Sequence, residues 1–512
     1  MTDFSITLEE AKEIAASGSY NVIPVSCSIM SDIITPIELM RKLKNVSTHC
    51  YMLESAQANE YWGRYTFMGY DPKMAISCMD GELTVSSRCD EESEGGNGEA
   101  AFTSGSNLEN KVYKTDKPWE ILRTILEDYK SPRLEDMPPF TGGLVGYFSF
   151  DYFCYCEPSA SRSVEDNDAF KDLDLMLFDR VIAFDNVSQK IILIVNARCD
   201  DIEAGYGKAK EELLRMRNLI LHGEKSREET GKLTGEVTAL FTKEEYCDMV
   251  ERGKKHIREG DIFQIVLSNR LSAPFKGSLL DTYRVLRTIN PSPYMFYFSG
   301  TDVEVAGASP ETLVKLEDGI LHTFPLAGTR PRGKTRQEDE ALEKELLADE
   351  KELAEHNMLV DLGRNDLGKI SEFGSVEVEK LHSIERYSHV MHIGSTVRGK
   401  IRREYDALDA VNAVLPAGTL SGAPKIRAVQ LIGELENNKR GIYGGAIGYI
   451  DFAGNMDTCI AIRLVYKKND RVYVRSGAGI VADSDPEKEY QECLNKAKAS
   501  LRSLELSQEV DA

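Results

Sequence analysis

A polar segment near the middle of the chain most constrains how these 512 residues can fold. His222–Val237 reads HGEKSREETGKLTGEV and separates a helical pattern from a new helix start. That start is marked by Thr242 and Glu245, which have the spacing of a capping box. Because a chain of this length exceeds one ordinary hydrophobic core, we expect two regions, residues 1–230 and residues 231–512.

A second polar segment, Asp90–Glu109, interrupts the N-terminal region. It is rich in Glu, Gly, Ser and Asn, and Phe102 is its only large apolar residue before Leu108. Such a segment buries too little apolar surface to offset the entropy of ordering it. We therefore expect a flexible surface insertion over residues 90–109.

Charge and cysteine usage exclude several classes of function. The net charge is -22 with a pI near 5.0, which argues against a general nucleic-acid binder because phosphate binding needs clustered Lys and Arg. Ten cysteines without a CxxC pair favour reduced, buried thiols. The N-terminus lacks signal-peptide features and no apolar run reaches 18 residues. We expect a soluble, cytoplasmic protein without a membrane segment.

The run Pro325–Gly333, PLAGTRPRG, indicates a site for a small, highly anionic molecule. Gly328 supplies a flexible backbone, Thr329 a hydroxyl, and Arg330 and Arg332 two guanidinium groups. These features alone leave the identity of the anion open.

Two acidic pairs on predicted helices are candidates for a metal site. A long charged helix over Glu338–Val360 would place Glu352 and Glu355 on one face, and a helix over Pro486–Leu501 would do the same for Glu489 and Glu492. Together the pairs could bind one hard divalent cation such as Mg²⁺. In a chain with 84 acidic residues, a solvated helix face is the alternative interpretation.

Other C-terminal residues permit two interpretations each. Ser476–Gly479 follows a strand at Arg471–Arg475, and its amides either hold a carboxylate or simply turn the chain. Arg463 lies among apolar residues and needs an anionic partner, either a structural carboxylate or a ligand. His392 is either structural or catalytic. The glycine-rich Thr141–Phe148 is favoured as a strand over a phosphate loop, because its spacing fits no phosphate-loop motif.

From about residue 240 to 505 the chain resembles the chorismate-utilising enzymes, and within them the component I chains of anthranilate synthases. The resemblance is carried by ordered, specific motifs: Gly260–Gln264, Gly307–Glu311, Ala327–Gly333, Glu355–Asp366, Val390–His392, Pro416–Lys425, Tyr443–Gly445 and Gly477–Gly479. The N-terminal region is similar more loosely, through Leu53–Ser55 and Arg64–Gly69.

This resemblance implies a fold and a substrate site. The fold is α+β, with two large, mainly antiparallel sheets packed as a sandwich and wrapped by helices. Both regions would contribute strands, so the division near residue 230 need not be a spatial one. The resemblance further implies that residues 231–512 form the chorismate-binding catalytic domain. There Mg²⁺ would hold the ring carboxylate through Glu352, Glu355, Glu489 and Glu492.

The same resemblance implies roles for single residues around chorismate. Gly328, Thr329 and Thr419 would line the ring site, with Thr419 among the catalytic residues. Glu311 would be the general acid for loss of the 4-hydroxyl, which requires a pKa raised by burial. His392 would assist the loss of pyruvate. The enolpyruvyl carboxylate would be held by the remaining group: Tyr443, Arg463, Gly477, Ala478 and Gly479.

Two positions discriminate between reactions within the family. Isochorismate and salicylate synthases have a lysine base where Gln264 stands, and glutamine has no useful basicity for activating water. Aminodeoxychorismate synthase has a lysine where this chain has Ala327, which cannot form that covalent adduct. The remaining reaction is amination at C2 followed by pyruvate elimination, which yields anthranilate.

The resemblance also implies partners and regulation. None of the ten cysteines lies in a Gly-x-Cys-x-Gly motif, so we expect ammonia from a separate glutamine amidotransferase subunit in a heterotetramer. Residues 1–230 would be regulatory, with feedback inhibition by tryptophan bound at Ser55 and Pro293–Met295 (Pro293, Tyr294 and Met295). The alternative is a non-catalytic, tryptophan-sensing subunit. A degenerate copy should have lost some of the implied catalytic or metal residues, and all are present.

Overall fold

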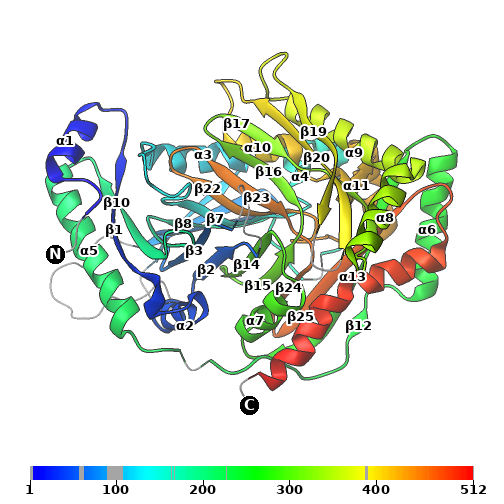
Figure 1. The fold of residues 1–512 in the computed structure, drawn as a ribbon, viewed down its shortest axis with the longest axis horizontal. Coiled ribbons are helices and arrows are strands. Elements are labelled where there is room, and N and C mark those ends of the chain that lie inside the picture. Colours follow the sequence, from blue (N-terminus) through cyan, green and yellow to red (C-terminus); the bar gives the residue numbers. More distant parts are fainter. Residues whose placement is uncertain are drawn as a thin grey trace.

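Two antiparallel sheets packed face to face form the body of the protein in a computed structural model (Figure 1). The structure describes residues 4–56, 63–88, 108–162, 164–166, 168–226, 228–386 and 390–510. Within these residues one sheet has 13 strands and the other has 12. The α+β sandwich expected from the sequence is confirmed.

The first sheet, which we call sheet A, contains these strands in spatial order: β1 (Val22–Met30), β10 (Lys190–Arg198), β9 (Arg180–Asp185), β3 (Tyr65–Tyr70), β2 (Cys50–Glu54), β14 (Tyr294–Ser299), β15 (Glu304–Ser309), β24 (Leu464–Lys468), β25 (Arg471–Ile480), β13 (Gln264–Lys276) and β11 (Lys232–Leu233). Two short strands also pair with β13: β12 (Thr238–Ala239) and β21 (Gly422–Ala423).

The second sheet, sheet B, has this spatial order: β18 (Leu326–Pro331), β20 (Val390–Lys400), β17 (Ile320–Thr323), β16 (Thr312–Glu317), β23 (Met456–Ile460), β22 (Ala446–Asp451), β7 (Gly143–Phe148), β8 (Leu173–Phe178), β4 (Met74–Met79), β5 (Glu82–Arg88) and β6 (Leu108–Lys114). The strand β19 (Glu377–Arg386) pairs with the second side of β20.

Helices cover the outer faces and one end of the sandwich (Figure 1). Sheet A packs against α1 (Leu8–Ala16), α2 (Pro36–Val46), α5 (Ile202–His222), α7 (Leu280–Ile289) and α13 (Pro486–Leu506). Sheet B packs against α3 (Pro118–Asp128), α4 (Phe153–Cys156), α9 (Glu350–Gly368), α10 (Ala407–Val414) and α11 (Gly418–Ser421). The end formed by β13 and β25 carries α6 (Lys243–Arg258) and α12 (Lys425–Glu436), and α8 (Arg336–Ala348) lies on β18 and β20.

Strands from both halves of the chain join within each sheet. In sheet A, β2 pairs with β14 in the register Phe296↔Leu53. In sheet B, β22 pairs with β7 in the register Gly448↔Gly146. The polar segment near residue 230 therefore divides the sequence, while the two sheets run continuously across both halves.

The inner core between the sheets is rich in aromatic rings. Tyr51 of sheet A packs edge-on against Phe178 of sheet B with ring centroids 4.7 Å apart. The strands alternate between this layer and the helices outside, as expected for sheets covered on both faces. The apolar burial on both sides fixes the register of each strand, because a slip of one residue would exchange its two faces.

Three local expectations differ from the structure. The single helix over Glu338–Val360 is two helices, since Asp349 ends α8 and caps α9 by accepting from the amides of Lys351 and Glu352. The turn at Ser476–Gly479 is instead part of β25, paired with β13. Leu108 and Glu109 belong to β6, and residues 90–107 of the predicted insertion lie outside the described residues.

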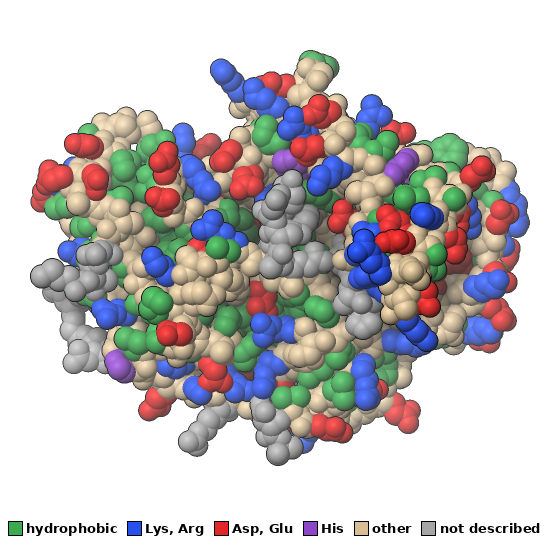
Figure 2. Space-filling model, viewed as in Figure 1, with side chains coloured by type: hydrophobic (Ala, Val, Ile, Leu, Met, Phe, Trp, Pro, Cys, Tyr) green, Lys and Arg blue, Asp and Glu red, His purple; other side chains and the backbone are tan. Residues whose placement is uncertain are grey.

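The predicted helix start at Thr242 is confirmed, because Thr242 and Glu245 form a reciprocal capping box before α6. Among the described residues, no helix is long and apolar enough to cross a membrane. Acidic and basic side chains intermix over the described part of the face shown in Figure 2. That distribution gives this face no single basic stripe of the kind that nucleic-acid phosphates require.

Candidate functional site

Most of the predicted substrate residues come from strand ends and helix starts at one end of the sandwich. Glu311 lies between β15 and β16, His392 in β20, and Arg463 between β23 and β24. The helices α9, α11 and α13 supply Glu352 and Glu355, Thr419, and Glu489 and Glu492, respectively. The end of β25 adjoins both α11 and α13, so motifs from distant parts of the sequence meet here.

Glu311 is a buried carboxyl whose side chain has one hydrogen-bond partner among the described residues. Thr419 Oγ1 donates to Glu311 Oε1 at 3.1 Å. Burial raises the pKa of Glu311 to about 8, against which Thr419 and the charge of Lys496 act only partly. The carboxyl is therefore protonated at neutral pH and can donate a proton.

His392 is held in one tautomer by the backbone of the predicted anion run. Its Nδ1 donates to the carbonyl of Gly328 at 2.8 Å and lies 3.1 Å from Thr329 Oγ1. A carbonyl only accepts, so Nδ1 carries the proton and Nε2 is the basic nitrogen. Burial lowers the pKa of His392, and the nearby charge of Arg463 lowers it further, so the imidazole is neutral.

The two arginines of the same run are used differently from the sequence expectation. Arg330 forms ion pairs with Glu345, Asp349 and Glu352 at 3.0, 2.9 and 3.3 Å. Arg332 pairs with Asp339 at 2.6 Å. The prediction that both guanidinium groups bind a small anion is therefore wrong, because α8 and the first turn of α9 neutralise them.

Gly328 of this run is required by its backbone and by its neighbours. Its φ of +63° lies in the region that favours glycine. A Cβ there would stand 3.0 Å from Leu346 Cδ1 and 3.2 Å from Glu352 Oε2. The glycine thus lets β18 approach the helix that carries the first predicted metal pair.

The four predicted metal glutamates differ in exposure, since Glu352, Glu355 and Glu489 are half-buried and Glu492 is exposed. Burial raises the pKa of Glu355, and the charge of Glu352 adds to this rise. Burial also raises the pKa of Glu489, with a further contribution from Glu492. The charge of Lys351 on α9 acts to lower the pKa of both Glu355 and Glu489. The helices α9 and α13 therefore lie close enough for their charges to interact.

This excess of poorly solvated negative charge is what a divalent cation would neutralise, so the donor set fits Mg²⁺ in chemistry. The side chains are not gathered as tightly as in a closed site. Among the described residues, no three of the four bring ligand atoms within 4.8 Å of one another. Arg330 and Lys496 instead hold Glu352 and Glu492 at 3.3 and 2.7 Å.

Arg463 is a cation without a carboxylate partner within 4 Å among the described residues. Its Nη1 donates to the carbonyl of Lys496 at 3.2 Å. Burial lowers the pKa of Arg463, while Tyr443 and Glu492 oppose that shift. Of the two partners that the sequence left open, a structural carboxylate is not found in the described part of the chain. The guanidinium is suited to an anionic ligand.

Gly477 packs closely against Tyr443, and Gly479 packs closely against Gln264. A Cβ on Gly477 would lie 3.0 Å from Tyr443 Oη and 2.6 Å from a β13 carbonyl oxygen. A Cβ on Gly479 would lie 2.8 Å from Gln264 Nε2. Small residues in this stretch of β25 therefore leave space for the phenol and the amide. Ala478 is fully buried against α12 and α6.

Gln264 occupies the discriminating position between these elements. Its Nε2 donates to Glu355 Oε1 at 3.5 Å, and its buried Oε1 has no hydrogen-bond partner among the described residues. The side chain offers a neutral acceptor where a general base would otherwise stand. Ala327, the second discriminating position, lies in β18 opposite Ile393.

Lys496 is a site residue that the sequence reasoning missed. Its Nζ pairs with Glu492 and donates to the carbonyl of Gly477 at 3.1 Å. Its charge lowers the pKa of three site carboxyls, although burial outweighs it in each: Glu311, Glu355 and Glu489. The i, i+4 spacing from Glu492 on α13 was the available signal.

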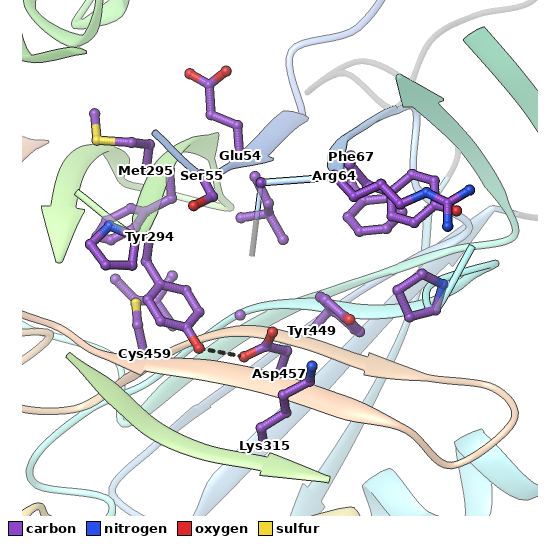
Figure 3. A pocket seen from close by; sticks show the side chains of 18 of the residues that line it. Glu54, Ser55, Arg64, Phe67, Tyr294, Met295, Lys315, Tyr449, Asp457 and Cys459 are labelled. Atoms are coloured by element: carbon purple, nitrogen blue, oxygen red, sulfur yellow. Dashed lines mark hydrogen bonds between the residues drawn. The ribbon is translucent and has the colours of Figure 1, made fainter. Parts of the chain in front are cut away.

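A separate cavity of about 360 Å³ lies between the sheets where the two halves of the chain join (Figure 3). Strands β2, β3, β14, β16, β22 and β23 contribute its walls. It is lined by all four residues predicted for an amino-acid effector: Ser55, Pro293, Tyr294 and Met295. Its size is within the range of small-molecule sites.

The polar groups of this cavity already have protein partners. Tyr294 Oη donates to Asp457 Oδ1 at 2.8 Å (Figure 3). The carboxylate of Glu54 accepts from Tyr283 at 2.5 Å and from Arg287 at 3.0 Å. The cavity thus has a fixed polar frame around an apolar wall.

Tyr294 also links the cavity to Glu311. Its hydroxyl lies 2.9 Å from Thr312 Oγ1, and Thr312 is the residue directly after Glu311. The carbonyl of Glu311 accepts from the amide of Ile460, next to the cavity residue Cys459. One side chain and one strand pair therefore separate the cavity from the buried acid.

The chain is similar to known proteins over almost its whole length. The model of the chorismate binding enzyme family matches residues 80–502. The anthranilate synthase component 1 of Acetivibrio thermocellus is 44% identical over 520 residues, which covers 99% of this chain and 100% of that protein. The protein of the same name from Aquifex aeolicus is 42% identical, with 99% of each chain covered.

Solved structures show the same fold. Anthranilate synthase component I from Streptococcus pneumoniae matches with a TM-score of 0.72 and 36% identity, covering 92% of this chain and 98% of that one. The menaquinone-specific isochorismate synthase from Escherichia coli matches with a TM-score of 0.67 at 18% identity, over 97% of this chain and 99% of that one. The second likeness concerns the fold alone.

Proposed function

The chain belongs to the chorismate-binding enzymes, in the branch of the anthranilate synthase component 1 proteins, and from that premise we propose the reaction it carries out. The proposed reaction is the amination of chorismate at C2 with ammonia, followed by elimination of pyruvate to give anthranilate. This would be its contribution to tryptophan biosynthesis.

The observation that carries the proposal is that Glu311 can act as an acid and His392 as a base. Glu311 is protonated because burial raises its pKa to about 8, so it can give a proton to the departing 4-hydroxyl, which leaves as water. His392 is neutral with a basic Nε2, so it can accept the C2 proton as the enolate of pyruvate leaves and the ring becomes aromatic. The imidazolium can then give this proton to the methylene carbon of the enolate, which yields pyruvate. One acid and one base suffice for these two steps.

Binding would be divided among charged groups around the ring. Arg463, which lacks a carboxylate partner in the described residues, would hold the enolpyruvyl carboxylate together with Tyr443 and the backbone at Gly477–Gly479. Mg²⁺, when bound by Glu352, Glu355, Glu489 and Glu492, would clamp the ring carboxylate and neutralise the crowded negative charge. Thr329 and Thr419 would line the ring.

Gln264 supports ammonia rather than water as the nucleophile. A carboxamide does not deprotonate water, so it would not activate water to attack C2. Ammonia can attack C2 without such a base, because it is already a nucleophile. Ammonia would come from a glutamine amidotransferase subunit, and a heterotetramer is the assembly we propose. The proposal for the partner rests on the sequence, where no cysteine lies in a Gly-x-Cys-x-Gly motif.

We propose the inter-sheet cavity as the tryptophan site for feedback inhibition. Ser55 and Tyr294 would contact the polar part of the ligand, and Met295 would pack on the indole. Because Tyr294 contacts Thr312, next to Glu311, a ligand that moves Tyr294 would also change the setting of the acid. Thermodynamic linkage then requires chorismate and tryptophan to weaken each other's binding equally.

One assay tests the central proposal. Purified protein with chorismate, Mg²⁺ and ammonium should form fluorescent anthranilate, and tryptophan should suppress it. Isochorismate or 4-amino-4-deoxychorismate as the product would refute the proposed chemistry. Intact tryptophan binding with no ammonia-dependent activity would instead favour a non-catalytic sensing subunit.

A further inference from the structure

A buried cluster behind the candidate active site fastens α9 to sheet B. His356 is 0% exposed, and its Nε2 lies 2.6 Å from Ser395 Oγ in β20. Ser395 Oγ accepts from the amide of His382 in β19 at 3.1 Å, so its own proton is available to His356 Nε2. Neither the substrate site nor the cavity uses these side chains.

A second contact, which lies at the exposed edge of the buried pair, comes from an unusual backbone conformation. His382 has a φ of +56° at a point where the register of β19 and β20 shifts. A non-glycine residue in this region is strained and persists only where its surroundings hold it. Here the bulge lets His382 Nε2 donate to Asn357 Oδ1 at 2.8 Å and sets its ring edge-on to His356, with centroids 5.5 Å apart.

The cluster lies directly beside residues of the active site. His356 and Asn357 follow Glu355 on α9, and Ser395 follows His392 by three residues on β20. The cluster thus joins β19 and β20 to α9. At this point α9 carries the predicted metal-binding carboxylates and β20 carries His392. We infer that His356, bound to Ser395, is a positioning residue that sets α9 and its Glu352 and Glu355 against His392. This inference rests on the proposed function.

Small displacements between these groups have large kinetic effects, since a misplacement of about 1 Å can cost on the order of a hundredfold in rate. Loss of one hydrogen bond of the cluster should shift α9 by less than this. Ser395→Ala and His356→Leu should each lower kcat by about tenfold and raise the Mg²⁺ concentration for half-maximal activity. The dissociation constant of tryptophan should stay within about twofold, because the cavity does not touch the cluster.

The matched control is Ser371→Ala, the same change at another buried serine near α9. The Ser371 hydroxyl has no hydrogen-bond partner among the described residues, so kcat should remain unchanged. His356→Gln keeps a polar group at the reach of Nε2 and should restore kcat to within about threefold. In a double-mutant cycle, His356→Leu combined with Ser395→Ala should lower kcat little more than either change alone.

A measurement without substrate or metal separates positioning from the reaction itself. Amide hydrogen exchange over residues 350–368 should accelerate in Ser395→Ala and His356→Leu, and not in Ser371→Ala. Faster exchange with unchanged kcat, or lowered kcat with unchanged exchange, would overturn the inference. Wild-type protein that makes no anthranilate would overturn the proposed function instead, while the exchange experiment would still report on the cluster.

Discussion

The inter-sheet cavity and the candidate active site differ in how their polar groups are satisfied. In the cavity, Tyr294 and Glu54 already have partners on neighbouring strands and helices. In the active site, Glu311 has a pKa raised to about 8, and Arg463 has no carboxylate partner within 4 Å among the described residues. A site for reversible binding can be built from satisfied groups, whereas a reaction site holds groups whose partner is the substrate.

The largest effect should come from removing the buried acid. Glu311→Gln keeps the shape and the Thr419 contact but has no proton to give, so kcat should fall by about a hundredfold to ten-thousandfold. The measurement is anthranilate formation from chorismate and ammonium. Tryptophan affinity should be unchanged, and near-full activity would contradict the role of Glu311.

The role of Glu311 as an acid should also appear in the pH dependence of kcat and of stability. The pKa of Glu311 is raised from its ordinary 4.5 to about 8, so wild-type kcat should fall as pH rises through about 8. The protonated carboxyl stabilises the fold fully below pH 4.5, and this stability is lost as pH rises through 8. In denaturant titrations, the free energy of unfolding of Glu311→Gln should not show this loss between pH 4.5 and pH 8. An identical pH slope in both proteins would contradict the burial of an ionisable acid.

A smaller effect is expected when the unpaired cation is removed. Arg463→Gln loses a charge-assisted hydrogen bond to a ligand carboxylate, worth roughly 3 kcal/mol, so kcat/KM for chorismate should fall about a hundredfold. Because no protein carboxylate in the described residues loses its partner, thermal stability should be retained. A drop in stability with kcat/KM unchanged would mean that Arg463 is structural.

Filling the cavity tests the other region. Ser55→Phe adds a ring to a space of about 360 Å³ and should raise the dissociation constant of tryptophan at least about tenfold. Anthranilate formation without tryptophan should continue, since the added ring occupies the cavity that Ser55 lines and not the candidate active site. Calorimetry with tryptophan and an inhibition curve provide the two measurements. Inhibition that survives the substitution would remove the cavity as the tryptophan site.

The smallest effect should be on the link between the two regions. Thr312→Val removes the hydroxyl that contacts Tyr294 and should weaken the mutual effect of tryptophan and chorismate by about three- to fivefold. The control is Thr458→Val on the adjacent strand, whose buried hydroxyl donates to the Val314 carbonyl at 2.8 Å instead. Equal coupling in both variants would show that Thr312 is not part of the link.

Sequence motifs indicated candidate site residues but not the contacts that surround them in the fold. The motif around Glu311 and the i, i+3 glutamate pairs could be recognised because each lies within a short stretch. For Lys496 the sequence offers only the i, i+4 spacing from Glu492, and its place in the site depends on β25 and α13 lying side by side. The anion run failed for the same reason, because the carboxylates that neutralise Arg330 come from α8 and α9.

The fold was predictable to a similar degree. Periodicity and capping indicated some of the helices, including the start of α6 at Thr242, but not the break at Asp349, where one side chain ends a helix and caps the next. The glycines of Ser476–Gly479 suggested a turn, whereas pairing with β13 keeps this stretch extended. Strand pairing overrode the local signal at Ser476–Gly479, whereas the break at Asp349 is set by a local cap that the helical periodicity did not reveal.

The pairing of β2 with β14 has a consequence for dissecting the protein. A cut within the polar segment near residue 230 would leave each half with two long, unprotected strand edges, one from each sheet. Separately expressed halves should therefore aggregate, whereas halves produced together can meet along those edges and rebuild both sheets. Such a reconstituted pair would allow isotope labelling of one half at a time across the cavity that both halves enclose.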